Sequence, residues 1–230
     1  MGERRRPRRW KVVPVVIVCL LGLGATVWFV WLPTYRPELE EGERFGIDVS
    51  HHQGSIDWKL VADDDIAFAY IKATQRDDFV DPRFEENWHA ATDAGLQRGA
   101  YHFFSLCASG EAQARHFISV VPDDADALPP AVDLELLGTC DRRPDAATVA
   151  RELADFLRIV ESSTGTSVVL YVGDDFEERY PVHEQLDRPT WVLRFLRRPE
   201  GEWWLWQVGG YANVDGIDGR VDLDVMAASP

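Results

Sequence analysis

From Phe45 onward, short apolar runs alternate with segments of helical periodicity, and this alternation restricts the fold more than any other feature of the sequence. Two helical patterns are clear. One begins with Asp81 as the expected N-cap and Pro82 at the first position, and the other covers residues 145–161 with an apolar stripe. The apolar runs read as buried strands and cover residues 45–49, 66–71, 99–104, 131–136 and 168–172. Strands that alternate with helices predict a parallel sheet covered by helices.

Beyond residue 172 the helical pattern fades, while strand-like segments continue at 191–193, 205–208 and around Val221. The expected fold class is therefore α/β, and the architecture is a modified, partly irregular β/α (TIM-like) barrel with about five β/α units plus three further strands. We assign this barrel domain to residues 45–230. A chain of 230 residues has room for one such barrel and does not require a second.

The N-terminal residues have a different character. Residues 1–11 contain six basic side chains and one acidic one, and residues 12–32 contain no charge. At about 1.5 Å per residue, the uncharged run is long enough to cross a hydrocarbon core of about 30 Å. We expect a basic cytoplasmic tail over 1–11, a transmembrane signal-anchor helix over 12–32 and a linker over 33–44 that is rich in Pro and Glu.

This arrangement predicts a single-pass protein of the cell membrane, with a cytoplasmic N-terminus and an extracytoplasmic domain. The alternative is a secretory signal cleaved near Leu23-Gly24-Ala25, followed by secretion. Both interpretations export the domain. With an intact anchor, a linker of twelve residues spans at most roughly 40 Å, which would keep the domain close to the membrane surface.

The charge of the chain argues against nucleic acid as a partner. The net charge is −15, and because residues 1–11 contribute +5, the remainder carries −20. Such a remainder repels a phosphate backbone. The sequence also lacks a glycine-rich phosphate loop and a G-x-S-x-G motif, which disfavours a nucleotide enzyme or a serine hydrolase.

The three cysteines have different settings. Cys19 lies within the expected membrane helix, whereas Cys107 and Cys140 each follow an expected strand at the same end of the sheet. In an exported domain the latter two are expected to form a disulfide, with two free thiols as the alternative. No zinc site is expected, because the sequence has no second close pair of Cys or His at ligand spacing.

Four carboxylates stand at the ends of expected strands: Asp48, Asp133, Glu135 and Asp222. In a β/α barrel this is where active sites are built. Asp133 and Glu135 should point to the same side, because strand side chains alternate. Barrel closure should make Asp48 and Asp222 neighbours. Acids that are clustered and partly desolvated raise the pKa of one another. A carboxyl group that is still protonated at neutral pH can donate its proton to the leaving oxygen of a glycosidic bond.

A single Asp at a strand end is more often a turn or a helix cap, and four carboxylates could also bind a divalent metal ion. Four acids at one barrel end favour acid catalysis. The aromatic residues Tyr101, Tyr171 and Trp206 stand at or near strand ends and could stack on a sugar or belong to the core, and Gln207 could bind sugar or backbone groups. His51 and His52 could line the groove or serve as structural partners, and His102 is expected in the core.

The sequence resembles family 25 glycoside hydrolases, the N-acetylmuramidases, along nearly all of residues 45–226. The opening motif Phe45-Gly46-Ile47-Asp48-Val49-Ser50-His51-His52-Gln53-Gly54 with Ile56-Asp57-Trp58 carries the resemblance, together with Phe68–Thr74, Phe79–Phe84, Gly99–Phe104, Asp133-Leu134-Glu135, Leu170–Gly173, Trp206-Gln207 and Val221-Asp222-Leu223. The resemblance implies five β/α units plus further strands. It also implies cleavage of the β-1,4 bond between N-acetylmuramic acid and N-acetylglucosamine in peptidoglycan, and this chemistry requires no cofactor.

The family's catalytic positions map onto Asp48, Asp133, Glu135 and Asp222. The resemblance implies that Glu135 is the general acid. Asp133 would stabilise positive charge or orient the acetamido group, while Asp48 and Asp222 would hold the sugar or tune Glu135.

The sequence departs from the family in two places near the groove. Gln75 and Arg76 replace the Glu-Gly that many members carry, and Leu193-Arg194 precede Phe195 where a small residue and an aromatic are usual. Three other interpretations predict different sequence features or a different use of the barrel. A chitinase-like hydrolase would carry further aspartates where Leu128, Pro130 and Ala131 stand. A non-catalytic glycan-binding module would not need all four acids, and a membrane adaptor would use the barrel as a protein interaction surface.

Overall fold

The computed structural model describes residues 12–136, 140–183 and 185–228, and the chain divides into two compact units at Arg36/Pro37. The first unit is helical. It runs through α1 (Val12–Thr26), the π-helical turn η2 (Val27–Trp31) and the 3₁₀ turn η3 (Leu32–Thr34). Within it, Val13–Thr34 is long and apolar enough to cross a membrane by length and composition, a property that a signal sequence shares. The basic tail expected over 1–11 lies outside the described residues.

The hydroxyl groups of the two threonines in this segment donate hydrogen bonds to backbone carbonyls of the preceding turn. Thr26 Oγ1 donates to the carbonyl of Gly22 at 2.9 Å, and Thr34 Oγ1 donates to the carbonyl of Val30 at 3.1 Å. Bonds of this kind to the preceding turn leave a polar side chain without unmet donors in an apolar surrounding.

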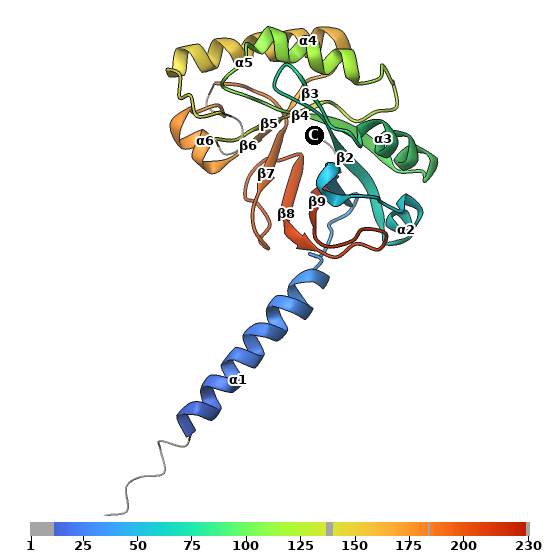
Figure 1. Cartoon of the computed structure of the whole chain (residues 1–230), viewed down its shortest axis with the longest axis vertical. Helices are drawn as coiled ribbons and strands as arrows, with labels where there is room; N and C mark the ends of the chain where they lie inside the picture. Colours follow the sequence, from blue (N-terminus) through green and yellow to red (C-terminus); the bar gives the residue numbers. More distant parts are fainter. Residues whose placement is uncertain (1–11, 137–139, 184, 229–230) are drawn as a thin grey trace, which may run out of the picture. The chain divides into compact units, whose positions relative to one another are not determined.

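The second unit is a closed barrel of eight strands (Figure 1). Its strands are β1 (Arg44–Val49), β2 (Ile66–Gln75), β4 (Gln97–Phe103), β5 (Ala131–Leu134), β6 (Val169–Val172), β7 (Thr190–Leu193), β8 (Leu205–Ala212) and β9 (Val221–Met226). A short β3 (Phe79–Val80) pairs with the end of β2. This confirms the expected irregular β/α barrel, and the parallel β1–β2 pairing closes it.

The last strand, β9, runs antiparallel to both of its neighbours, β8 and β1. The reason is local. Only residues 213–220 connect β8 to β9, too few for the crossover that a parallel pair needs. The start of β9 therefore lies at the same end of the barrel as the carboxyl ends of the parallel strands.

Five helices surround the barrel in the described part of this unit: α2 (Trp58–Asp63), α3 (Phe84–Asp93), α4 (Gly110–Val120), α5 (Ala146–Thr164) and α6 (Asp174–Arg179). The two clear helical patterns correspond to α3 and α5. Asp145 caps α5 by accepting from Thr148 N at 2.9 Å, whereas the N-cap of α3 is Arg83 and not Asp81.

Helix α4 gave no clear pattern because its inward face is small and polar, with Gly110, Gln113 and Ala114 buried beside Phe117. The glycine permits close packing on α5. A Cβ at Gly110 would stand 1.7 Å from the carbonyl oxygen of Glu152.

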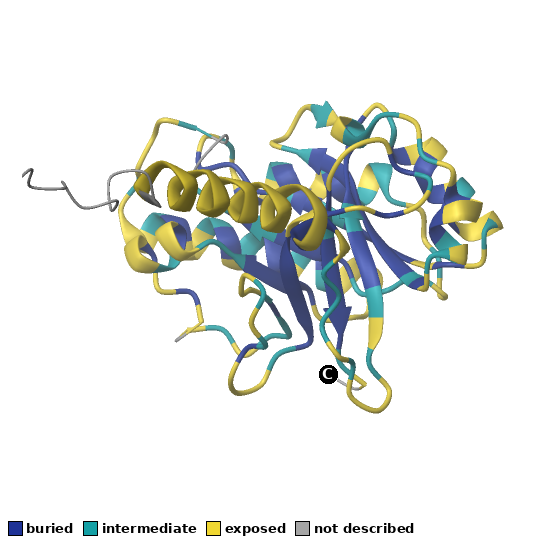
Figure 2. Cartoon of the chain, turned by 90° about the horizontal axis from the view of Figure 1, so that it is seen from below, coloured by how far each residue is buried: buried dark blue, intermediate teal, exposed yellow. Residues whose placement is uncertain are grey.

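A cluster of buried residues, many of them aromatic, fills the barrel interior. Tyr70 is fully buried, donates to the carbonyl of Pro129 at 2.8 Å and contacts the Trp191 ring at 5.0 Å between centroids. Glycines on the neighbouring strands make room for such rings. A Cβ at Gly99 would stand 2.4 Å from Tyr70 and one at Gly46 2.3 Å from Phe68. Figure 2 shows these strands buried, with exposed positions on the outer faces of the helices.

Part of the segment expected to be a linker is fastened to the barrel. Arg198 donates to Glu43 Oε2 at 2.8 Å and to the carbonyl of Glu38 at 2.9 Å. Its guanidinium lies over the rings of Trp203 and Trp206. Residues 38–43 therefore belong to the folded unit, and the Glu43 side chain is only 6% exposed.

Candidate active site

All four carboxylates singled out in the sequence line one cavity of about 200 Å³ at the carboxyl end of the parallel strands. The expected juxtaposition is confirmed, and the catalytic role of the four residues stays a prediction. The complete lining is Asp48, Tyr101, Asp133, Glu135, Tyr171, Trp191, Gln207 and Asp222.

Strand register explains how the four side chains meet. Asp48 on β1 and Asp222 on β9 are directly opposed partners of the antiparallel pair. Asp133 lies on β5, and Glu135, two residues after Asp133, directly follows the end of that strand. Gly210 leaves room for Asp222, since a Cβ there would stand 2.8 Å from Asp222 Oδ1.

A chain of hydrogen bonds fixes Asp48. The Tyr171 hydroxyl donates to Gln207 Oε1 at 3.2 Å, and Gln207 Nε2 donates to Asp48 Oδ2 at 2.8 Å. Burial and then the surrounding carboxylates raise the pKa of Tyr171, so the phenol stays protonated and remains a donor. Gln207 therefore serves one of the acids, and only 8% of its surface is exposed.

Aromatic rings form a wall of the cavity. Trp191, which sequence reasoning missed as a site residue, contacts Tyr171 at 5.5 Å and Tyr101 at 6.5 Å between ring centroids, both edge to face. The prediction for Trp206 is corrected. It precedes Gln207 on β8 and so faces the opposite side of the strand, where it is 1% exposed and donates to the carbonyl of Arg194 at 2.8 Å.

The environment favours the protonated form of the acids. Burial raises the pKa of Glu135, and the nearby Asp175 and Asp222 raise it further, while Lys72 opposes the shift. Burial and then the negative charge of Glu135 raise the pKa of Asp133. The Asp133 Oδ1 atom is buried and finds no hydrogen-bond partner among the described residues.

The Asp48–Asp222 pair is shifted in the same direction. Burial raises the pKa of Asp222 to about 6. Burial and then the charge of Asp222 raise the pKa of Asp48, against the hydrogen bond from Gln207, which lowers it. The surroundings therefore favour the protonated form of both acids of this pair.

Lys72 is a site residue that sequence reasoning did not identify, although it interrupts an apolar strand. Its ammonium donates to Gln75 Oε1 at 2.9 Å and lies 4.5 Å from the centre of the Phe103 ring. Burial lowers its pKa, and Asp133 is the first of the carboxylates that counteract this. Gln75, one of the departures from the family pattern, thus orients a buried cation.

A second cavity of about 380 Å³ adjoins the first and shares Asp48, Tyr101, Asp133 and Asp222 with it. Lys72, Gln75 and His52 also line it. The other departure, Leu193 to Phe195, lines neither of these two cavities.

His51 and His102 both have structural roles. His51 is a structural partner: its Nδ1 and backbone N both bond to Asp81 Oδ2, at 2.7 and 3.0 Å. His102 lies in the core as expected. It is fully buried between Thr74 and Gln113, and burial lowers its pKa to about 3.

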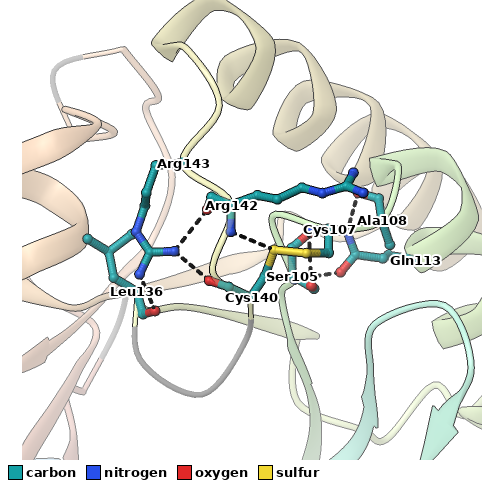
Figure 3. The surroundings of a disulfide bond; sticks show 8 residues. All are labelled: Ser105, Cys107, Ala108, Gln113, Leu136, Cys140, Arg142 and Arg143. Atoms are coloured by element: carbon teal, nitrogen blue, oxygen red, sulfur yellow. Dashed lines mark hydrogen bonds between the residues drawn. A yellow bond between two sulfur atoms is a disulfide. The ribbon is translucent and has the colours of Figure 1, made fainter.

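Cys107 and Cys140 form the expected disulfide, with Cα atoms 5.7 Å apart (Figure 3). The bond joins the loop after β4 to the loop after β5, which carries Glu135. On the second loop, Arg143 donates to the carbonyls of Leu136 at 3.1 Å, Cys140, and Arg142 at 2.8 Å. The loop that follows the expected general acid is therefore braced from two directions.

Metal binding finds no support in the described residues, where no group of three or more His, Cys, Asp or Glu side chains is placed to hold an ion.

A β/α barrel with clustered carboxyls of raised pKa under an aromatic wall defines the class: a glycoside hydrolase. Residues 47–217 match the model of glycosyl hydrolases family 25. The chain belongs to this family.

Individual relatives agree with this assignment. The chain is 38% identical over 190 residues to the uncharacterized protein YegX of Escherichia coli (strain K12), covering 79% of this chain and 68% of that protein. It is 34% identical over 199 residues to Lysozyme M1 of Streptomyces globisporus, covering 80% and 68%. The structure of a family 25 glycosyl hydrolase from Bacillus anthracis superposes with a TM-score of 0.75 at 33% identity, covering 84% of this chain and 92% of that one.

Proposed function

We propose that this protein is a peptidoglycan hydrolase, an N-acetylmuramidase that cleaves the β-1,4 bond between N-acetylmuramic acid and N-acetylglucosamine. The observation that carries the proposal is the convergence of Asp48, Asp133, Glu135 and Asp222 on one cavity in a chain of family 25. Similarity to proteins named lysozymes, such as Lysozyme M1, supports the choice of substrate.

Glu135 is the proposed general acid. Its carboxyl is partly exposed to the cavity, and its pKa is raised by burial and by the negative charges of Asp175 and Asp222. A carboxyl that holds its proton near neutral pH can deliver it to the glycosidic oxygen as the bond to the anomeric carbon breaks. The water that completes hydrolysis supplies the new anomeric hydroxyl.

Asp133 is the proposed partner of Glu135. Asp133 lines the cavity, and its carboxyl group suits either of two tasks: stabilising positive charge on the sugar ring or accepting from the acetamido N–H. The positive charge of Lys72 lowers the pKa of Asp133 and so favours its ionised form. Asp48 and Asp222 would hold the sugar or tune Glu135.

The proposed sugar contacts are Tyr101, Tyr171 and Gln207, with Trp191 added from the cavity lining. Aromatic rings offer apolar faces to the C–H faces of a sugar, while Gln207 presents amide groups at the same wall.

For the N-terminal helix we propose a membrane anchor with its N-terminus in the cytoplasm and the barrel outside. The apolar span Val13–Thr34 supports this, and signal cleavage is the alternative outcome. Mass determination of the protein recovered from the membrane fraction and from the medium decides between them, because cleavage removes the apolar helix.

The decisive experiment is a digest of purified peptidoglycan with the full chain in detergent micelles, with the new reducing ends identified by mass spectrometry. Glu135→Gln keeps the size of the side chain and removes the proton that it donates. Asp174→Asn, at a highly exposed position near the rim, is the matched control. The proposal predicts reducing ends of muramic acid with wild type and Asp174→Asn and none with Glu135→Gln. Intact glycan that stays bound to wild type would indicate a binding module instead.

A further inference from the structure

Asp224 is a buried acid that the mechanism above does not use. It lies on β9 two residues after Asp222, so both side chains point into the barrel. Met226, two residues further on, belongs to the aromatic cluster of the barrel interior. Asp224 thus stands between the cavity and the core, and it has no exposed surface.

The two oxygens of Asp224 have different partners. Oδ1 accepts from Trp191 Nε1 at 2.9 Å. Oδ2 is buried, and no N–H group of the described residues bonds to it. The carboxyl groups of Asp224 and Asp48 are hydrogen-bonded to each other. Two carboxyl groups can share a hydrogen bond only if one of them carries a proton.

The surroundings decide which of the two carries it. Asp48 opens on the cavity and already accepts from Gln207 Nε2 at 2.8 Å, which favours its ionised form. Asp224 is sealed in the interior, where the ionisable groups that face it are Asp48 from β1, Asp222 from its own strand and Tyr70 from β2. In the described part of the chain no Lys, Arg or His forms an ion pair with Asp224.

The electrostatics point in the same direction. Burial raises the pKa of Asp224, the charges of Asp48 and Asp222 raise it further, and the hydrogen bond with Asp48 raises it again. The same hydrogen bond lowers the pKa of Asp48. Because Asp224 has no exposed surface and no paired cation among the described residues, its neutral form is favoured, and this makes it the donor of the bond.

We propose that Asp224 is a protonated carboxylic acid that donates its proton to a hydrogen bond with Asp48 and so acts as a positioning residue for the active site. It links the indole N–H of Trp191, a cavity wall residue, to Asp48, a cavity floor residue. Asp48 is then held between two donors, Asp224 and Gln207. The effect on hydrolysis rests on the proposed function, whereas the protonation state does not.

Two substitutions distinguish hydrogen bonding by the Asp224 side chain from a role in packing alone. Asp224→Asn keeps the shape, because its carbonyl can accept from Trp191 and its amide can donate to Asp48. Asp224→Leu has similar size and makes neither bond. We expect Asp224→Leu to lose about tenfold or more in kcat on solubilised peptidoglycan fragments, since an uncompensated buried acceptor is left at Asp48. The acidic limb of its pH profile should move to higher pH, because Asp48 loses a donor that lowers its pKa.

Asp224→Asn should recover most of the activity that Asp224→Leu loses, with both limbs of the pH profile in place. Two results would overturn the proposal. If Asp224 were ionised, Asp224→Asn would remove a negative charge and move the basic limb to lower pH. If it only filled space, Asp224→Leu would leave the acidic limb where it is.

Infrared spectroscopy without substrate tests the protonation of Asp224 separately from the proposed hydrolase function. The infrared difference spectrum of full-length wild type minus Asp224→Asn at pH 8 should contain the carbonyl band of a protonated carboxylic acid. A carboxylate band in its place would overturn the assignment even if the enzyme is active. Conversely, the acid band in a wild type that cleaves no glycan would leave Asp224 as assigned and reject the proposed function alone.

Discussion

Asp48 and Asp222 are directly opposed partners in the antiparallel pair of β1 with β9, the pair that joins the last strand of the barrel to the first. Like charges at directly opposed positions of a sheet repel each other. Burial adds to this, raising the pKa of Asp222 to about 6 and that of Asp48 as well. The closure of the barrel therefore holds two acids together at a cost in stability, as expected of a functional site.

Asp222→Asn should stabilise the fold at the expense of activity. The folded pKa of Asp222, about 6, exceeds the unfolded value of 3.8, so this group contributes stability below pH 3.8 that is lost as the pH rises through 6. The variant should be more stable than wild type by roughly 1–3 kcal/mol at pH 8 and about equal at pH 3.5. Urea unfolding at both pH values, beside the exposed control Asp218→Asn, measures this. A variant that loses stability at pH 8 would contradict the argument.

Asp175→Asn should narrow the pH range of hydrolysis. Asp175 is exposed on α6, and its charge is the first after burial among the causes that raise the pKa of Glu135. Without that charge Glu135 loses its proton at lower pH, so the basic limb of kcat/KM against pH should move down. Asp174→Asn is the control, because this neighbour is exposed and does not contribute to the shift of Glu135. Equal profiles for the two variants would show that Asp175 does not act on the general acid.

Much of the barrel could be predicted from the sequence because most residues of its strands are apolar and α5 has a wide apolar stripe. Helix α4 could not, because Gly110 and Gln113 replace large apolar residues at its buried face. The direction of β9 depends on a short connection and not on the strand's own residues.

The candidate site could also be predicted in part from the sequence. The spacing of Asp133 and Glu135 placed two acids on one side of a strand, and the same spacing in Asp222 and Asp224 was a signal left unused. Trp191 could not be assigned, because its role depends on the register of β6 with β7 and on a bond to a distant strand. Trp206 was misplaced for a related reason: one position along a strand reverses the side that a residue faces.

Removal of the disulfide should destabilise the barrel without removing any catalytic group. Cys107 and Cys140 are 33 residues apart, and a cross-link that closes a loop of this length is worth roughly 3–4 kcal/mol in the chain-entropy model. The double variant Cys107→Ser, Cys140→Ser should unfold at correspondingly lower urea concentration, with lower kcat because the loop after Glu135 loses a brace. Cys19→Ser, in the apolar helix, is the matched control and should leave the barrel's stability unchanged. Equal midpoints for all three proteins would show that the bond adds nothing to the folded state.

Arg198→Met should release the segment that enters the barrel. Arg198 pairs with Glu43, whose side chain is 6% exposed, so the variant leaves a buried carboxylate without its cation. Loss of one partner of such a pair costs about 3–5 kcal/mol when the other stays charged, and the partial exposure of Arg198 places the expected value at or below the lower end. Hydrogen exchange measured by mass spectrometry should show faster exchange over residues 38–43.

Two further variants make this test specific to the Arg198–Glu43 pair. Arg197→Met removes an exposed ion pair with Glu200 and should change stability by less than about 0.5 kcal/mol. Glu43→Gln added to Arg198→Met should restore part of the lost stability, because the unpaired buried charge is then gone. If the double variant is instead as unstable as the sum of the single ones, Arg198 holds the segment through its contacts with Trp203 and Trp206 and not through Glu43.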